Sequence, residues 1–420
     1  MEVCMLTRSV LAHSIGGMER HIDLLVRELA KLGHSVTVIT TALKNGQDGG
    51  GGGNADGGGG GSGSKKRSGN EERQGAGGGS RGQSAGRQEG VRYIFTEGTE
   101  PGAYSRSFWS ASRKALSGLE PDIVHSQSIG AYGVLGDLRK RDLPMVATCH
   151  GTPLSDAATA FRTHGLRANP AHLMGIMSKT PHHLKVYGEA KRVIADTKPI
   201  ADHLVKMKHA PASKIDVVLL GVDTDFFSPV AGSFQKESEG HELFSIARVV
   251  KDKGFHFLIA AMPALLKEHP GARLIVGGDG PYLPDLKALA RKLGIEKAVR
   301  FTGRVPEQEL PGLYRSCDLF ALATTFVEGF GLVLAEAMAC GKPAASARIG
   351  GVTDVIREGV TGRLFEPGDQ KDITRTLLEL LSDPAKLKTM GEAAREDTLA
   401  RFSAAKTARD TAAVYEKALK

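Results

Sequence analysis

The sequence has little cysteine, and what it has is scattered. Its four cysteines, at positions 4, 149, 317 and 340, form no C-x-x-C pair. Such spacing argues against a disulfide framework or a cysteine-based metal site. No basic, apolar leader precedes Cys4, so we expect reduced, buried thiols in a cytoplasmic protein. Apolar runs near the ~18 residues of a membrane span are also lacking, so we expect no transmembrane helix.

Aromatic residues are scarce too, at 5% of the chain, and they do not alternate with basic residues. The net charge of +8 favours anionic partners such as phosphates. Because the lysines and arginines are spread along the chain, we do not expect a nucleic-acid partner. The pattern G-x-G-x-x-G is missing from "SIGGMER", which argues against a dinucleotide-binding dehydrogenase.

The chain has 420 residues, of which 41% are hydrophobic, enough to form two domains with separate cores. Residues 44–90 stand apart, because they hold 20 of the 53 glycines. A segment of this composition cannot bury enough apolar surface to offset its ordering entropy. We therefore expect a disordered insert in the first domain, between strands at "HSVTVITTA" and "VRYIFTEG".

Elsewhere, strand and helix patterns alternate. Expected helices include 17–32, 255–268, 281–293, 307–316 and 331–340, and expected strands include "VCML", "PDIVHSQ", "PMVATCHG", "IDVVLL", "LFSIA", "RLIVGG", "VRFTG", "DLFALAT" and "PAASA". Repeated strand–helix units predict parallel sheets covered on both faces. We expect an α/β protein with two Rossmann-like domains facing across a cleft, and a break near residues 221–229.

The segment "EGFGLVLAE" carries two glutamates, Glu328 and Glu336, at the ends of an apolar stretch. If its helix begins near Gly331, both carboxylates can face one ligand, and the first backbone N–H groups can bind phosphate oxygens. Carboxylates accept hydrogen bonds from hydroxyls, so the segment suits a sugar joined to a diphosphate and a ribose. The alternative is a buried helix with Glu328 favoured by the dipole. Glu336 argues against it, because an unpaired carboxylate among apolar residues is costly.

Basic residues follow another strand of the same predicted sheet. Arg248 comes just after "LFSIA", and Lys253 lies in the next loop. An arginine and a lysine so placed can neutralise a diphosphate. The turn "GGDGP" follows a third strand. Because the carboxyl ends of parallel strands share one edge, we expect these groups near one site.

With these motifs, the chain resembles glycosyltransferase family 4, which comprises retaining enzymes of the GT-B fold. The resemblance rests on "SIARVVKDKGFHFLIAAMP", "LIVGGDGP", "VRFTGRVP", "EGFGLVLAEAMACGKPAASARIGG" and "GVTGRLFEPGD", and on "GGMERHIDLLVRELAKLGHSVTVIT", "PDIVHSQS", "TCHGTP" and "GVDTDFFSP". It implies an acceptor-side domain at 1–225, a nucleotide-sugar donor domain at 226–402, and a C-terminal helix at 403–420 packing back on the first domain.

The resemblance also implies roles for individual residues. Glu328 would hold hydroxyls of the donor sugar, Glu336 the ribose diol, and Arg248 and Lys253 the diphosphate; His150 would face the transferred sugar. Main-chain groups would hold the phosphates at Gly16, Gly17, Phe330, Gly331 and Leu332, and the base at Gly303, Arg304 and Val305. We take His150, Arg248, Lys253 and Glu328 as catalytic, with a nucleotide-sugar donor and no cofactor or metal.

Several alternatives remain open. The triplet Asp223–Asp225 could bind a divalent cation, but it falls in the expected connection between domains. Adjacent His182 and His183 point in different directions on a helix, which argues against a metal site. The basic stretch 171–192 could contact anionic lipid, although a solvated face suits it better. An epimerase or a binding-only protein could share the fold. The nucleobase, the sugar, the acceptor (a sugar, a lipid-linked or a small molecule) and the oligomeric state stay undetermined.

Overall fold

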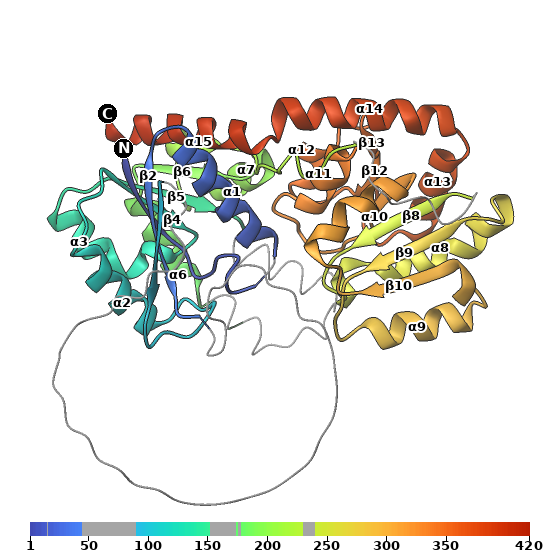
Figure 1. Cartoon of the computed structure of the whole chain (residues 1–420), viewed down its shortest axis with the longest axis horizontal. Coiled ribbons are helices and arrows are strands. Elements are labelled where there is room, and N and C mark those ends of the chain that lie inside the picture. The colour runs from blue at the N-terminus through green and yellow to red at the C-terminus, as the bar shows by residue number, and fades with distance from the viewer. Residues whose placement is uncertain (15, 44–89, 152–173, 175–177, 230–239) are drawn as a thin grey trace, which may run out of the picture.

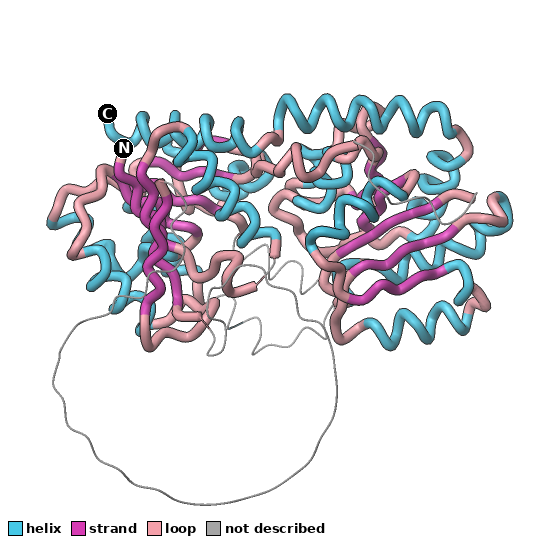
Figure 2. The backbone as a smooth tube through the Cα atoms, in the orientation of Figure 1, coloured by secondary structure: helices cyan, strands magenta, loops and turns pink. Residues whose placement is uncertain are grey.

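The computed structural model describes residues 1–14, 16–43, 90–151, 174, 178–229 and 240–420. The predicted insert, apart from Gly90, lies outside the described residues, as does part of the stretch 171–192. The described chain forms two α/β units side by side, each built around a parallel sheet (Figures 1 and 2). None of its described helices is long and apolar enough to cross a membrane.

The first sheet has seven parallel strands in the order β3-β2-β1-β4-β5-β6-β7. Its strands are β1 (Glu2–Leu6), β2 (Ser35–Thr41), β3 (Val91–Thr96), β4 (Ile123–Gln127), β5 (Met145–Cys149), β6 (Arg192–Ala195) and β7 (Ile215–Val217). The central strands are buried almost completely, which explains why they read as continuous apolar runs. The predicted strand "IDVVLL" is shorter than expected, because it ends at Val217.

The second sheet has six parallel strands in the order β10-β9-β8-β11-β12-β13. Its strands are β8 (Glu242–Ile246), β9 (Arg273–Gly277), β10 (Val299–Gly303), β11 (Leu319–Leu322), β12 (Ala344–Ala347) and β13 (Gly362–Phe365). The chain crosses from β8 to β11 only after forming β9 and β10 on the other side. Because the strand order reverses here, the carboxyl ends of β8 and β11 leave a crevice between the loops that follow them.

Helices cover both faces of the two sheets (Figure 2). In the first domain they are α1 (Gly17–Lys31), α2 (Arg106–Leu116), α3 (Leu135–Lys140), α6 (Thr180–Glu189) and α7 (Lys198–Lys206). In the second they are α8 (Phe255–Glu268), α9 (Leu283–Lys292), α10 (Leu310–Ser316), α11 (Leu332–Ala339), α12 (Val352–Val355), α13 (Gln370–Leu381) and α14 (Pro384–Arg401). Short 3-10 turns include η4 (Lys251–Lys253) and η6 (Glu307–Glu309), so the predicted helix 307–316 begins as such a turn.

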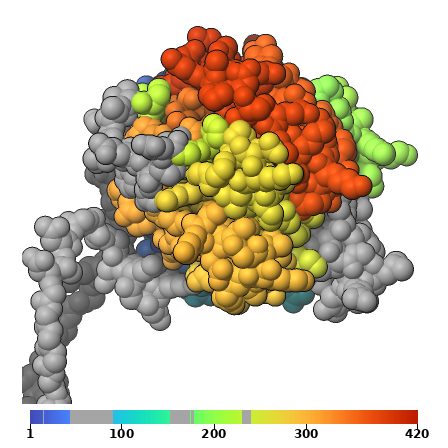
Figure 3. Space-filling model, turned by 90° about the vertical axis from the view of Figure 1, so that its right-hand side faces the viewer, coloured from blue at the N-terminus to red at the C-terminus, as the bar shows by residue number. Residues whose placement is uncertain are grey.

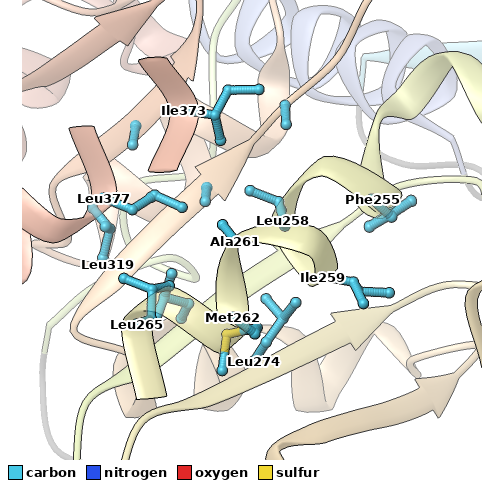
Figure 4. Packing of buried hydrophobic residues seen from close by; sticks show 14 of the residues in the cluster. Phe255, Leu258, Ile259, Ala261, Met262, Leu265, Leu274, Leu319, Ile373 and Leu377 are labelled. Atoms are coloured by element: carbon cyan, nitrogen blue, oxygen red, sulfur yellow. The ribbon is translucent and has the colours of Figure 1, made fainter. Parts of the chain in front are cut away.

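Helix α8 shows how the apolar spacing builds the core of the second domain. Phe255, Leu258, Ile259 and Met262 repeat at helical spacing, and all are fully buried. They belong to one cluster with Leu274 of β9 and with residues of α13 (Figure 4). Helices α8, α9, α13 and α14 form much of the outer surface of this domain (yellow to red in Figure 3). The second sheet is thereby fixed in position, with its carboxyl edge turned to the first domain.

The chain passes between the domains twice, and the two passages lie side by side. The N–H of Val222 donates to the carbonyl of Phe402 at 2.8 Å, and the N–H of Ala404 donates to the carbonyl of Val222 at 3.1 Å. A Cβ at Gly221 would lie 2.6 Å from Cα of Ala404, so only glycine permits this approach. The paired passages form one narrow connection.

The last helix, α15 (Ala404–Leu419), returns to the first domain and packs beside α1 (Figure 1). Its buried residues join the core cluster that includes Val146 of β5 and Ile194 of β6. Tyr415 is fully buried, and its hydroxyl lies 2.7 Å from Nδ1 of His125 in β4. The C-terminal helix therefore completes one face of the first sheet.

Candidate active site

Both sheets reverse their strand order at a point that faces the other domain. The reversal lies between β1 and β4 in the first sheet and between β8 and β11 in the second. Ligands of open parallel sheets bind beyond the carboxyl ends of the strands at such points. Arg248 follows β8 and is exposed, Glu328 follows β11, and Gly16 and Gly17 follow β1. His150 follows β5, the next strand beyond β4.

Lys253 and Glu328, which the sequence places 75 residues apart, form an ion pair. The Nζ atom of Lys253 lies 2.7 Å from Oε1 of Glu328, and both side chains are mostly buried. Lys253 also lies over the Phe326 ring, 4.3 Å from its centroid. The turn that presents the lysine depends on Gly254, whose φ is 71° and whose Cβ would collide with the Ala323 carbonyl. The expected meeting of these two loops is present.

Glu336 lies on α11 and is only 2% exposed. Arg20 Nη1 donates to its Oε1 at 3.0 Å, and the Tyr314 hydroxyl donates to its Oε2 at 2.7 Å. Burial raises the pKa of Glu336, while Arg20 and Tyr314 act against that rise. The carboxylate therefore has the polar partners that its apolar sequence context required. Each of its oxygens can still accept a further hydrogen bond.

Arg20 is a site residue that the sequence reading missed. It belongs to the first turn of α1, where the helix dipole disfavours a cation. That unfavourable placement was the signal available in the sequence. Its partners could not be identified there, because Glu336 and Glu307 belong to the other domain.

The starts of α1 and α11 face each other. Gly331 has a φ of 88° and is the N-terminal cap residue of α11. A Cβ at Gly17 would lie 3.2 Å from Cδ1 of Leu332, so the two helix starts lie close together. Phe330 is buried against Phe402, with ring centroids 5.5 Å apart. Its side chain belongs to the core, which leaves its backbone for contact with a ligand. Two helix starts at one point suit an anionic group.

The loop after β10 lies on the same edge. Gly303 has a φ of 68°, and its carbonyl accepts a hydrogen bond at 2.8 Å from the N–H of Gly278, in the "GGDGP" turn. Arg304 is exposed, and Val305 packs against the core cluster that contains Tyr314. The two glycine turns are thus joined, as expected for groups at one sheet edge.

His150 is held at both ring nitrogens. Its Nδ1 lies 2.7 Å from Oδ2 of Asp196, and its Nε2 lies 2.7 Å from Oε1 of Gln127. Burial raises the pKa of Asp196, and the nearby His150 lowers it. The His21 ring lies edge-on to His150 at 5.6 Å, and burial keeps its pKa well below the usual value. The sequence reading named His150 but missed Asp196 and Gln127, whose signal was a polar residue at the end of a buried strand.

The two domains are in direct contact around Gly329. A Cβ at Gly329 would lie 2.5 Å from the carbonyl oxygen of His150. The Thr197 hydroxyl donates to the Gly329 carbonyl at 3.0 Å, and the Lys198 N–H donates to Oδ2 of Asp354 at 2.6 Å. A cavity of about 90 Å³ lies beside these contacts, lined by Gly151, Pro199, Ile200, His203, Val327, Glu328, Gly329 and Gly350. Residues of both domains therefore line one small cavity.

The residues considered for metal binding have other contacts. Oδ1 of Asp223 accepts the N–H groups of Asp225 and Phe226 at 3.1 and 2.9 Å, so it shapes a local turn. His182 packs against Trp109, and His183 contacts Tyr187. Within the described ranges, no group of three or more His, Cys, Asp or Glu residues is arranged to hold a metal ion.

Family models match both halves of the chain. The model described as "Glycosyltransferase Family 4" matches residues 15–226, and "Glycosyl transferases group 1" matches residues 231–397. The D-inositol 3-phosphate glycosyltransferase of Thermobispora bispora is 31% identical over 338 residues, which cover 74% of this chain and 75% of that protein. A GDP-mannose-dependent alpha-(1-6)-phosphatidylinositol monomannoside mannosyltransferase of Mycolicibacterium smegmatis is 35% identical over 197 residues, 44% of this chain and 52% of that protein.

Solved structures share the fold at low sequence identity. Sucrose-phosphate synthase from Thermosynechococcus elongatus superposes with a TM-score of 0.75 at 18% identity, covering 99% of this chain and 98% of that one. Anabaena HepE in complex with UDP-glucose superposes with a TM-score of 0.71 at 19% identity, covering 98% of each chain. The prediction of two Rossmann-like domains in the GT-B arrangement is confirmed.

Proposed function

This chain belongs to glycosyltransferase family 4, and from that premise we propose that it moves a sugar from a nucleotide-diphosphate sugar to an acceptor hydroxyl, with retention at the anomeric carbon. The observation that carries the proposal is the Lys253–Glu328 pair at 2.7 Å. It places a cation for phosphate and an acceptor for sugar hydroxyls at one point of the sheet edge. That point also borders the contact between the domains.

Stabilisation of the leaving nucleotide is the main physical effect in this mechanism. The diphosphate gains negative charge as the bond to the sugar breaks. Arg248 and Lys253, together with the starts of α1 and α11, would bind that charge, and preorganised groups of this kind lower the barrier most in a closed site. Because two cationic side chains supply the positive charge, the proposed reaction needs no metal.

In this proposal the first domain contacts the transferred sugar through His150, which would face the sugar from the opposite side of the domain contact. The hydrogen bonds of His150 to Asp196 and Gln127, both 2.7 Å, would fix the orientation of the imidazole ring. A sugar hydroxyl would take the place of Gln127 at Nε2. The carboxylates described around the site already bind Lys253, Arg20 or His150. This supports a front-face reaction through an oxocarbenium-like state over a covalent glycosyl-enzyme.

The other two activities have less support. An epimerase needs acid and base groups near C2 of the sugar, and His150 is the one such group that we find among the described residues of the site. A binding-only protein would be expected to lack Arg248, Lys253 or Glu328, and the chain has all three. The proposal therefore remains a transferase.

The donor can be identified by thermal unfolding. The chain is heated with UDP-, GDP- and ADP-sugars in turn, and a donor at 100 times its Kd should stabilise the fold by about 2.7 kcal/mol. Lys253→Met should lose that shift, whereas Arg291→Gln, an exposed change on α9, should keep it. If all nucleotide sugars gave the same stabilisation, or if Lys253→Met and Arg291→Gln were stabilised equally, the proposed donor site would be contradicted.

Sugar transfer is then measured with the donor found in this way. Relatives are named for inositol 3-phosphate and phosphatidylinositol mannoside acceptors, so the acceptor panel starts with inositol phosphates, lipid-linked sugars and free sugars. The anomeric configuration of the product is determined by NMR. Inversion would contradict retention while leaving the transferase activity in place.

A further inference from the structure

Arg20 connects the first domain to two carboxylates of the second. Its Nη1 lies 3.0 Å from Oε1 of Glu336, and its Nε lies 3.1 Å from Oε1 of Glu307. The arginine side chain is 17% exposed, against 3% for Glu336 and 30% for Glu307. Charge-assisted hydrogen bonds with this little solvent contact are among the stronger polar interactions in proteins.

The two carboxylates belong to different parts of the donor pocket. Glu336 is the proposed ribose residue, and its other oxygen is fixed by Tyr314 of α10. Glu307 lies in η6, just after the loop 303–305 that we assign to the base. Arg20 itself lies in the first turn of α1, the helix whose first residue lies close to Leu332. A single guanidinium from the first domain thus contacts the ribose residue and the segment that follows the base loop.

We propose that Arg20 is a positioning residue that couples domain closure to the donor pocket, by binding Glu336 and Glu307 only when the first domain lies against the second. Closure would then orient Glu336 from two sides, with Tyr314 already in place. It would also hold η6 near the first domain, so that the base loop and the phosphate-binding helix starts are fixed together. This inference rests on the proposed function, since it takes Glu336 as the ribose residue.

An arginine suits this role better than a lysine. Its planar group presents several N–H donors in fixed directions, so it can bind two carboxylates at once, whereas a lysine ammonium lies at the end of a flexible chain. Arg20→Lys therefore keeps the charge and loses the fixed geometry. Arg27 is the matched control, because it is on the same helix and, among the described residues, forms its ion pair within that helix, with Asp23.

The test combines kinetics with a double-mutant cycle. Arg20→Gln should lower kcat/KM for transfer about 10- to 30-fold, Arg20→Lys should fall between it and the parent, and Arg27→Gln should stay within twofold. Glu307→Gln should lower kcat/KM about 3- to 10-fold. The double variant Arg20→Gln/Glu307→Gln should be no worse than Arg20→Gln alone, since paired residues are not additive. The proposal would be overturned if the kcat/KM losses of the two single variants multiplied in the double variant, or if Arg20→Gln lowered kcat/KM less than twofold.

Small-angle X-ray scattering supplies a second readout that needs no substrate. Arg20→Gln should increase the radius of gyration of the whole chain, and Arg27→Gln should not. An unchanged radius, or a melting temperature lowered in Arg20→Gln far more than in Arg27→Gln, would assign Arg20 a merely structural role. Should the parent transfer no sugar, the proposed function fails, while the scattering result still decides whether Arg20 closes the domains.

Discussion

Replacing Glu336 by glutamine removes one charge from the centre of the site and keeps the side chain's shape. The carboxylate is 2% exposed and accepts hydrogen bonds from Arg20 and Tyr314. Hydrogen bonds to charged groups contribute about 1.5–3 kcal/mol, and those between neutral groups about 0.5–1.5 kcal/mol. The amide should therefore lose about 1–1.5 kcal/mol for each ribose hydroxyl it holds. For two hydroxyls, binding of a nucleoside diphosphate should weaken about 30- to 150-fold.

The same substitution should change stability in a pH-dependent way. Burial raises the pKa of Glu336, so the folded chain binds a proton at this carboxyl more readily than the unfolded chain does. The unfolding free energy from this group therefore falls as the pH rises from the ordinary glutamate pKa through the raised folded pKa. Glutamine does not titrate. The difference in melting temperature, Glu336→Gln minus parent, should increase as the pH rises above about 4, the ordinary range of a glutamate pKa.

Two measurements check this prediction. Isothermal titration calorimetry with UDP, GDP and ADP gives the affinities, and scanning calorimetry at several pH values gives the melting temperatures. Glu392→Gln, an exposed change on α14, is the control and should alter neither. If Glu336→Gln binds nucleotide as tightly as the parent, the ribose assignment is wrong. A difference in melting temperature that stays constant with pH would refute the argument from burial.

Three further predictions concern the surrounding site. Lys253→Met should lower kcat/KM about 10²–10³-fold. Asp223→Asn, which alters a turn, should lower kcat/KM far less. Activity that is lost in EDTA and returns only with a divalent cation would contradict this prediction. Gly329→Ala should block the contact between the domains and reduce sugar transfer at a nearly unchanged melting temperature, because its Cβ would meet the His150 carbonyl at 2.5 Å. Gly136→Ala, which has open space around it, is the control. Full transfer activity of Gly329→Ala would count against domain closure. His150→Ala should lower kcat about 10- to 100-fold, the size of one lost hydrogen bond to a developing charge, and raise the donor KM less; steady-state kinetics that show a change in KM alone would leave it a binding residue.

Much of the fold follows from local patterns. The helix at 255–268 and the strand "VRFTG" have the predicted bounds, because apolar spacing and flanking glycines define them within a few residues. The pairing of Lys253 with Glu328 was also foreseeable, since both follow strands of one parallel sheet. Such statements depend only on which edge of the sheet a residue occupies.

Other parts of the site depend on how distant segments meet. Arg20 and Glu336 are 316 residues apart in the chain, and their contact requires the docking of two separate domains. The partners of His150 depend on strand order, because β4, β5 and β6 must be neighbours before Gln127 and Asp196 can reach it. Periodicity and spacing carry no information on either point. The residues proposed to contact a ligand could thus be named from the sequence, whereas the residues that orient them could not.

The return of α15 to the first domain reverses the order in which the nascent chain can complete its domains. A protein leaves the ribosome from its N-terminus, and domains generally fold as units during synthesis. The last strand of the first sheet ends at Val217, yet the face over β5 and β6 stays uncovered until Ala404–Leu419 has been made. All strands of the second domain emerge in between. Until then, the first domain exposes an apolar surface that chaperones can bind. It is therefore the first domain to be translated and the last to be completed.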